Sequence, residues 1–342
     1  MSPNRSEHDL ADWKARAEVF ERELGNTVVG LQRAIRLITT AVFARGHVML
    51  EGDVGVGKTT LLRAVARCIG GAYERIEGTI DLMPNDLIYH TYINREGRPQ
   101  VDPGVILKHD DKLSTFFFNE VNRARPQVHS LLLRVMAERS ITAFNREYTF
   151  PHLQVFADRN RVEKEETFEM PAAARDRFMM ELNIEIPEGS EDRKTLMFNP
   201  RFHDVDRLMD RVRQGILPFE QLNGIAATIQ QEIRASDTLE RYALDLWEAT
   251  RNPARFGISI DLVDMHKLIL AGASARAMSM LLRAARVTAW LNGRSAMIPE
   301  DIQAVFYATI AHRIFFRPTY EIRRDQLIGP LMNGVLQTVS SP

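Results

Sequence analysis

Short apolar runs alternate with helical patterns through the first half of the chain, and five of these runs predict strands. The predicted strands are His47–Leu50, Tyr73–Ile76, Thr115–Phe118, Leu153–Ala157 and Met180–Ile186. Several of them carry apolar residues at successive positions, which is typical of parallel strands that are covered on both faces. The pattern therefore predicts an α/β fold in which helices cover a parallel sheet.

Helical periodicity dominates the rest of the chain. Two helices are predicted before the first strand, over residues 9–25 and 31–44, and polar helices over residues 191–235. A further run of helices is predicted over residues 239–336, with breaks at Asn252-Pro253, Asn292-Gly293 and Arg317-Pro318. The second half of the chain is therefore predicted to be helical.

The composition fits a soluble globular protein with two domains. The chain has 342 residues, of which 45% are hydrophobic, and a net charge of −1, so no overall charge attracts it to nucleic acid or to an anionic membrane. Because no strand is predicted after Pro187, we expect an α/β domain over residues 1–188 and a helical domain over 189–342. The single cysteine, Cys68, excludes a disulfide within the chain. The first residues lack the apolar core of a secretory signal, and we expect a cytoplasmic protein.

One motif indicates the ligand. Residues 52–59 read Gly-Asp-Val-Gly-Val-Gly-Lys-Thr, a complete G-x-x-x-x-G-K-[ST] phosphate-binding loop between a predicted strand and a predicted helix. The glycines let the backbone turn its N–H groups toward a polyphosphate, while Lys58 reaches the β- and γ-phosphates and the Thr59 hydroxyl holds Mg²⁺. The expected nucleotide contacts here are Asp53, Val54, Gly55, Val56, Gly57, Lys58, Thr59 and Thr60. The chain is therefore predicted to bind a nucleoside triphosphate with Mg²⁺.

The third predicted strand leads to the expected catalytic carboxylate. Ligands of open α/β sheets bind at the carboxyl ends of the strands, which places Glu120 beside the γ-phosphate as the group that orients or activates water. Asn119 precedes it, so the expected metal-side residues are Thr59, Asn119 and Glu120. The amide of Asn119 keeps an oxygen but lacks a charge, which should weaken the affinity for Mg²⁺.

Three further polar residues are candidates for the reaction. Asn160 follows the fourth predicted strand and is expected, ahead of Asp158 and Arg159, to hydrogen-bond the γ-phosphate or the attacking water. Arg177, in a helix leading to the last strand, is expected to reach the nucleotide of a neighbouring subunit in a ring. Arg276, at the start of a long helix, is expected to fold over the γ-phosphate and to couple nucleotide state to the domain angle.

Several short segments follow one another in a fixed order over about residues 25–315. They are Val28-Val29-Gly30, Gly46–Gly52 with the loop that follows, Asp81–Leu87, Pro103-Gly104, Asn119–Ala124, Met136–Arg139, Asp176-Arg177-Phe178, Gly272–Arg276 and Leu282–Arg286. In this combination the chain resembles the AAA+ ATPases of the MoxR family.

The resemblance implies a fold, a nucleotide and an assembly. It implies an AAA+ core with a helical insert near residues 81–90 and a β-hairpin near 140–150, followed by a helical lid. The segment at 28–30 would border the adenine of ATP. Proteins of this family typically form hexameric rings and act as chaperone-like remodelling or maturation ATPases on a protein client. They often work beside a partner with a von Willebrand factor A domain.

The resemblance also implies roles for single residues. Asn160 would be the sensor 1 residue, Arg177 an arginine finger that acts across a subunit interface, and Arg276 the sensor 2 residue. The chain departs from the family pattern at three places. It has Asn119-Glu120 where the family has Asp-Glu, and Ala-Asp-Arg-Asn-Arg at 157–161 where the family usually has Ala-Thr-Gln-Asn-Pro. It also has Ala275 where the family usually has Pro before the sensor 2 arginine.

We therefore expect a Mg²⁺-dependent ATPase that remodels a protein client. A GTPase is disfavoured because the chain has no Asn-Lys-x-Asp guanine motif. One alternative is a nucleotide-gated scaffold that hydrolyses little ATP, which the amide at Asn119 favours. A nucleic-acid motor is a weaker alternative, because the net charge is near zero and no appended DNA-binding domain is evident.

Overall fold

The computed structural model describes residues 3–160 and 168–342, with side chains from Asp9 onward; Arg161 lies outside these residues. The chain divides into two compact units, one of residues 1–178 and 182–225 and the other of residues 179–181 and 226–342. The units part at residue 225, further along the chain than the expected domain boundary at 188. In the described part of the chain, no helix has the length and apolar character that crossing a membrane requires.

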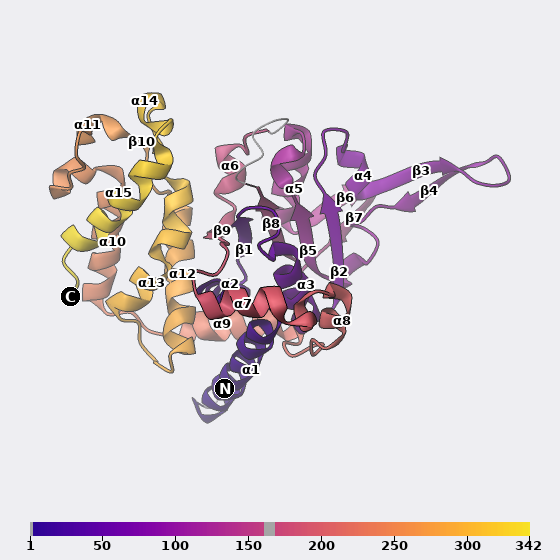
Figure 1. Ribbon diagram of the computed structural model, residues 1–342, viewed down its shortest axis with the longest axis horizontal. Helices are drawn as coiled ribbons and strands as arrows, with labels where there is room; N and C mark the ends of the chain where they lie inside the picture. Colours follow the sequence, from indigo (N-terminus) through magenta and orange to yellow (C-terminus); the bar gives the residue numbers. More distant parts are fainter. Residues whose placement is uncertain (1–2, 161–167) are drawn as a thin grey trace. The chain divides into compact units, whose positions relative to one another are not determined.

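A five-stranded sheet brings together the strands that the sequence predicts (Figure 1). The order is β2-β5-β8-β1-β9, and the pairs β2–β5, β5–β8 and β8–β1 are parallel. The strands span Ala72–Glu77 (β2), Leu113–Asn119 (β5), Gln154–Arg159 (β8), His47–Glu51 (β1) and Phe178–Asn183 (β9). The predicted α/β fold with a parallel sheet is confirmed. The last strand ends before the predicted Ile186, because β1 ends at Glu51, whose carbonyl accepts the last bond from the N–H of Ile184 at 2.7 Å.

Helices separate these strands as the alternation predicts. Before and between the strands they are α1 (Pro3–Thr27), α2 (Gln32–Phe43), α3 (Lys58–Ile69), α4 (Pro84–Ile88), α5 (Pro126–Glu138) and α6 (Ala172–Arg175). After the sheet come α7 (Ser190–Phe198), α8 (Val205–Asp210) and α9 (Leu222–Glu232). The helix α3 is amphipathic, with Leu61, Leu62 and Val65 fully buried, so the phosphate-binding loop is fixed between a buried strand and a buried helix face.

Two hairpins extend the first unit. Residues 81–90, expected as a helical insert, contain the short helix α4 and then lead into an antiparallel hairpin of β3 (Tyr89–Ile93) and β4 (Pro99–Pro103), which Figure 1 shows projecting from the sheet. This hairpin was not predicted, because its strands bury almost no side chain and so lack a hydrophobic period. A second hairpin, β6 (Ser140–Ala143) with β7 (Arg146–Thr149), lies where one was expected.

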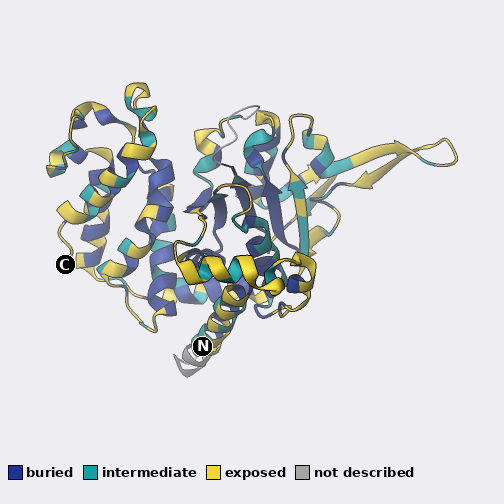
Figure 2. Cartoon of the chain, viewed as in Figure 1, coloured by how far each residue is buried: buried dark blue, intermediate teal, exposed yellow. Residues whose placement is uncertain are grey.

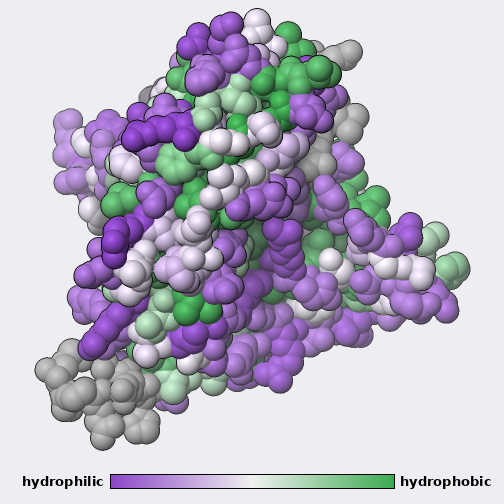
Figure 3. All heavy atoms as spheres, turned by 90° about the vertical axis from the view of Figure 1, so that its left-hand side faces the viewer, coloured by the Kyte–Doolittle hydropathy of each residue, from purple (hydrophilic) through white to green (hydrophobic). Residues whose placement is uncertain are grey.

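The second unit is mainly helical. Its helices are α10 (Asp237–Arg251), α11 (Met265–Leu268), α12 (Ala275–Leu291), α13 (Pro299–Ile310), α14 (Pro318–Glu321) and α15 (Arg324–Thr338). The expectation of no strand after Pro187 is wrong: β10 (Ile269–Ala271) pairs with β11 (Phe315–Phe316), two runs too short to show a period. The face of this unit seen in Figure 3 is largely hydrophilic, with apolar atoms gathered near its upper end. Leu262 and Ile322 are 96% and 90% exposed.

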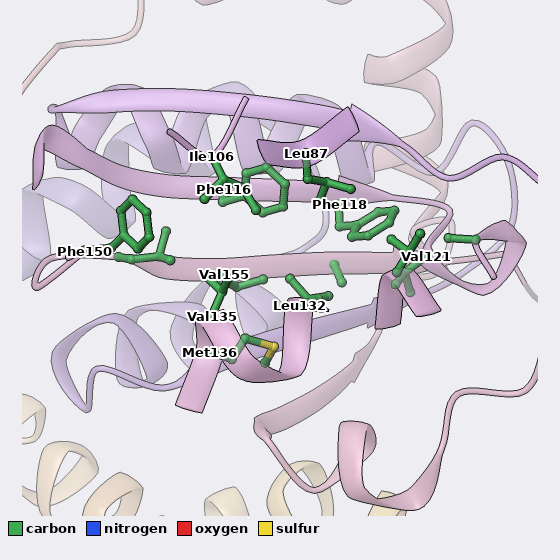
Figure 4. Close-up of a cluster of buried hydrophobic side chains, with 14 of the residues drawn as sticks. Leu87, Ile106, Phe116, Phe118, Val121, Leu132, Val135, Met136, Phe150 and Val155 are labelled. Carbon is green, nitrogen blue, oxygen red and sulfur yellow. The ribbon is translucent and has the colours of Figure 1, made fainter. Parts of the chain in front are cut away.

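The strands at the centre of the sheet are buried (Figure 2), and every residue of β5 is buried. Phe116 and Phe118 of β5 and Val155 of β8 point to one face, where they pack with side chains of α4 and α5 (Figure 4). Successive side chains of a strand point to opposite faces. Asn119 and Asp158 therefore share the other face of the sheet, at the carboxyl ends of neighbouring strands.

Candidate functional site

The phosphate-binding loop connects β1 to α3 and is open on one side. Gly55 and Gly57 have φ angles of +84° and +87°, a backbone conformation that glycine adopts at no steric cost. A Cβ atom added at either position would meet nothing within 4 Å. Lys58 is the first residue of α3. The backbone of the loop is therefore open to a ligand and runs directly into the N-terminus of α3, which is the arrangement that binds phosphates.

The ammonium of Lys58 is held inside this loop. Its Nζ donates to the main-chain oxygens of Gly52 and Asp53 at 2.6 and 3.0 Å, and to Oδ1 of Asn160 at 2.7 Å. Lys58 is buried, being 6% exposed. These three acceptors are uncharged, and the nearest carboxylate oxygen, of Asp158, is 3.8 Å away, so a phosphate group that enters the loop offers the lysine a closer, negatively charged acceptor.

Asn160 joins the lysine to the expected catalytic carboxylate. Its Oδ1 accepts from Lys58 and its Nδ2 donates to Oε1 of Glu120 at 3.2 Å. The other carboxylate oxygen of Glu120 accepts from Nη1 of Arg123 at 2.8 Å. Glu120 has a φ angle of +51°, a left-handed conformation that is uncommon outside glycine. The structure therefore brings three of the predicted catalytic residues, Lys58, Asn160 and Glu120, into one hydrogen-bonded chain.

A second carboxylate lies within this group. Asp158 is 2% exposed; its Oδ1 accepts the main-chain N–H of Glu120 at 2.6 Å, and its Oδ2 lies 3.8 Å from Nζ of Lys58. Burial raises the pKa of Asp158 to about 6, although the N–H of Glu120 and the charge of Lys58 both oppose that rise. Asn119 is also buried, and its Nδ2 donates to Oε1 of Glu77 at 3.2 Å.

The segment at 28–30, expected beside the adenine, lies close to the loop. A Cβ atom on Gly52 would approach the carbonyl oxygen of Ile184 to 2.2 Å, and one on Gly30 would approach the Cβ of Pro187 to 2.5 Å. Ile184 and Pro187 are three residues apart, a span of at most about 10 Å. Val28 is buried directly after α1 (Pro3–Thr27). The residues after β9 thus connect the start of the phosphate-binding loop to Gly30.

The two predicted arginines lie away from this group. The bond from Ile184 to Glu51 joins the carboxyl ends of β9 and β1, so Arg177, just before β9, lies at the opposite edge of the sheet from the loop. Among the described residues, the guanidinium of Arg177 has no hydrogen bond or ion pair, and its Nε is buried. Arg276 belongs to the second unit, in the first turn of α12, where Ser274 caps the helix by accepting from the N–H of Ala277.

The polar atoms around the loop suit a magnesium ion that arrives with a nucleotide. Within residues 3–160 and 168–342, no group of three or more His, Cys, Asp or Glu side chains forms a metal cage. The hydroxyl of Thr59 follows Lys58 on α3, and the oxygens of Asn119, Glu120 and Asp158 lie at the ends of β5 and β8. Mg²⁺ prefers hard oxygen ligands and usually takes one or two carboxylates together with the phosphates of its substrate. These residues fit that requirement.

Two members of the group were not predicted in their present places. Asp158 was expected to matter less than Asn160, because a sequence does not show that the side chain of Asp158 shares a face of the sheet with Asn119. No contact between Arg123 and the catalytic carboxylate was expected. The spacing held a signal for Arg123, since it follows Glu120 by three residues and the short helical turn Val121–Arg123 places the two side chains on one side.

Comparison with known proteins identifies the family of the chain. Residues 47–180 match the family described as the ATPase family associated with various cellular activities (AAA), and residues 264–329 match the AAA lid domain. The chain is 60% identical to Protein MoxR of Methylorubrum extorquens over 97% of each chain, and 54% identical to Protein MoxR of Paracoccus denitrificans over 98% of each.

More distant relatives share the same architecture. Chaperone MoxR1 of Mycobacterium tuberculosis is 32% identical over 94% of this chain and 81% of that protein. A crystal structure from Cytophaga hutchinsonii superimposes with a TM-score of 0.84 at 29% identity and covers all of this chain. The matched segments place the AAA domain over the sheet and the lid domain within the second unit. The chain therefore belongs to the MoxR family of AAA+ ATPases.

Proposed function

We propose that this protein hydrolyses ATP in a Mg²⁺-dependent reaction and uses it, as a ring, for chaperone-like remodelling or maturation of a protein client. The observation that carries the proposal is the position of Asn160 between Lys58 and Glu120. Lys58 is the residue that binds the phosphates, and Glu120 is the carboxylate for the attacking water. A side chain that contacts both is placed to respond to the γ-phosphate.

The contacts of Glu120 suit a general base. Its carboxylate is fixed between the amide of Asn160 and the guanidinium of Arg123, which limits its rotation and aims it toward the loop. Glu120 then orients water and accepts its proton as the water attacks the γ-phosphate. Bound Mg²⁺ would neutralise charge on the phosphates, with Thr59, Asn119 and Glu120 as the proposed metal-side residues.

Arg177 supports the assignment of a ring. It lies at the sheet edge opposite its own phosphate-binding loop, so we assign its guanidinium to the nucleotide of a neighbouring subunit, and Arg276 to the nucleotide of its own chain. Repeating such a head-to-tail contact forms a ring when the rotation between subunits closes on itself, and we propose a closed hexamer. The exposed Leu262 and Ile322 are apolar side chains of the kind that a subunit or client contact covers.

The proposed client class follows from relatives. Chaperone MoxR1 of M. tuberculosis carries a chaperone name, and we propose a protein client for this chain as well, with a von Willebrand factor A domain protein as partner. The reaction would take place in the cytoplasm. A nucleic-acid motor is disfavoured by the net charge of −1.

The test is steady-state hydrolysis of Mg²⁺-ATP by the wild type and by Glu120→Gln across a series of protein concentrations. We expect turnover per subunit to rise with concentration as rings assemble. We expect Glu120→Gln to lower turnover by about 100-fold or more, since it removes the base, while ATP still binds. Turnover that survives in Glu120→Gln would contradict the role of Glu120.

A nucleotide-gated scaffold is the second candidate. The observation that favours it is the buried amide of Asn119 at the metal side, where a carboxylate would bind Mg²⁺ more strongly. The same assay separates the two candidates. Tight ATP binding with no turnover in either protein, at any concentration, would support the scaffold and reject the ATPase.

A further inference from the structure

Three polar side chains form a row across the carboxyl ends of β2, β5 and β8. Glu77 pairs in register with Asn119, and Phe118 pairs with Ala157. The next pair along β5 and β8 is therefore Asn119 with Asp158. The row thus consists of a central amide with a carboxylate on each side.

The two carboxylates have different surroundings. The side chain of Glu77 is 57% exposed and pairs with Arg75 at 3.3 Å, on β2 at the edge of the sheet. Asp158 is 2% exposed and lies on β8, which is the direct neighbour of β1 and of the loop that follows it. The carboxylate on the loop side of Asn119 is therefore Asp158.

The two oxygens of Asp158 have different surroundings: one accepts a hydrogen bond and the other faces only a more distant cation. Oδ1 accepts the N–H of Glu120 at 2.6 Å. Within the described part of the chain, Oδ2 accepts no hydrogen bond, and its nearest cation is the ammonium of Lys58 at 3.8 Å. Lys58 has three closer acceptors. A buried carboxylate whose one cation is 3.8 Å away, with no hydrogen bond to the facing oxygen, is costly to retain, which points to a further cation that arrives with the ligand.

We propose that Asp158 supplies, for the Mg²⁺ that accompanies bound ATP, the carboxylate that Asn119 lacks. The inference rests on the proposed function, since it requires that the loop bind Mg²⁺-ATP. According to this proposal, the negative charge near Mg²⁺ comes from a residue beside Asn119 in the row and not from position 119 itself. The weakening of Mg²⁺ affinity expected from Asn119 alone is then offset by the neighbouring strand.

The test measures binding rather than turnover. A fluorescent N-methylanthraniloyl derivative of ATP is titrated into the protein in EDTA and then over a range of Mg²⁺ concentrations. We expect Asp158→Asn to raise the Mg²⁺ concentration for half-maximal tightening by about tenfold, as loss of a residue that supports a metal does. Its affinity in EDTA should be equal to or tighter than that of the wild type, because a negative charge near the phosphates is removed.

Glu77→Gln is the matched control, because it removes the carboxylate on the other side of Asn119. We expect its Mg²⁺ requirement to stay within about twofold of the wild type, given its exposure. The double variant Asn119→Asp with Asp158→Asn moves the charge one strand along and should restore the wild-type requirement. An unchanged Mg²⁺ requirement in Asp158→Asn, or an equal shift in Glu77→Gln, would overturn the inference.

Asn119→Asp alone tests the same idea without disturbing Asp158. If Asp158 already supplies the charge, this substitution should lower the Mg²⁺ requirement by less than about threefold. A fall of about tenfold would show that the wild-type site lacks a carboxylate, and would overturn the inference. A wild-type protein that binds the ATP derivative in neither condition would instead reject the proposed function.

Discussion

Gln154 and Asn160 are buried polar side chains at opposite edges of the central sheet, and their hydrogen bonds differ in kind. At the amino edge, Gln154 begins β8 and is 1% exposed. Its Nε2 donates to the main-chain oxygens of Ala41 and Gly46 at 3.3 and 2.6 Å, and its Oε1 accepts from Arg45 at 3.4 Å. At the carboxyl edge, just past the end of the same strand, Asn160 bonds the side chains of Lys58 and Glu120.

The difference indicates which edge carries function. Main-chain acceptors such as the oxygen of Gly46 stay in place as long as the fold does, so the bonds of Gln154 serve stability. Side-chain partners such as Lys58 and Glu120 can rotate and exchange one partner for a ligand. A polar group whose partners are side chains is therefore suited to report on what is bound. Arg177 is the exception, because it lies at the amino edge, where the proposed ring would bring it the nucleotide of a second subunit.

Substitution of Arg177 should have the largest effect, and it should act on ATP turnover. Arg177→Ala should lower ATP turnover by about 1,000-fold, the order of effect of an arginine finger, and Lys58→Ala should be inactive because it cannot bind the phosphates. Mixed in equal amounts, the two variants should recover about a quarter of the wild-type rate, since half of the subunits keep Lys58 and half of their neighbours keep Arg177. The measurement is turnover of the mixture against each variant alone. Absence of recovery in rings shown to exchange subunits would reject action across the interface.

The buried carboxyl group of Asp158, at the carboxyl edge, should make the stability of the protein depend on pH. Burial raises the pKa of Asp158 from 3.8 to about 6, so the folded protein binds a proton more tightly than the unfolded chain does. The stability that this proton contributes is present below pH 4 and is lost as the pH rises through 6. Asp158→Asn removes the buried charge, so with EDTA and no nucleotide it should be more stable than the wild type by about 3 kcal/mol at pH 7.5.

That difference should shrink toward zero as the pH falls to 4. Urea unfolding of both proteins at several pH values measures it, with Glu77→Gln as a control whose difference from the wild type should be small at every pH because Glu77 is exposed. A gap between Asp158→Asn and the wild type that does not change with pH would contradict the assignment.

Much of the fold and part of the site could be predicted from the sequence. Strands such as Thr115–Phe118 are short runs of successive apolar residues, a pattern that predicts a buried strand. The phosphate-binding loop has a motif whose spacing is fixed by its chemistry. Glu120 and Asn160 were predicted because they follow such strands. The hairpin of β3 and β4 was not predicted, since its residues are mostly exposed and carry no hydrophobic period.

The position of Asp158 could not be predicted for a different reason. Its importance depends on the register between β5 and β8, which places it beside Asn119, and register is set by packing over the whole sheet. A sequence shows that both residues follow apolar strands, but not that their side chains share a face. Arg276 remains a prediction, because it lies in the second unit.

The smallest expected effect concerns the amino edge itself. Gln154→Leu nearly keeps the side-chain volume but removes the acceptor of Nη1 of Arg45 and the donor to the carbonyls of Ala41 and Gly46, so we expect a loss of about 2 kcal/mol in the free energy of unfolding. The affinity for the ATP derivative should not change, because none of these groups lies at the loop.

Asn160→Ala, just past the other end of β8, should show the reverse: a loss of turnover with an unfolding free energy within about 1 kcal/mol of the wild type. Urea unfolding and nucleotide titration of the two variants measure both quantities. If Gln154→Leu weakened nucleotide binding as much as Asn160→Ala lowers turnover, the two edges would act as one network and their separation into a stabilising edge and a ligand-binding edge would fail.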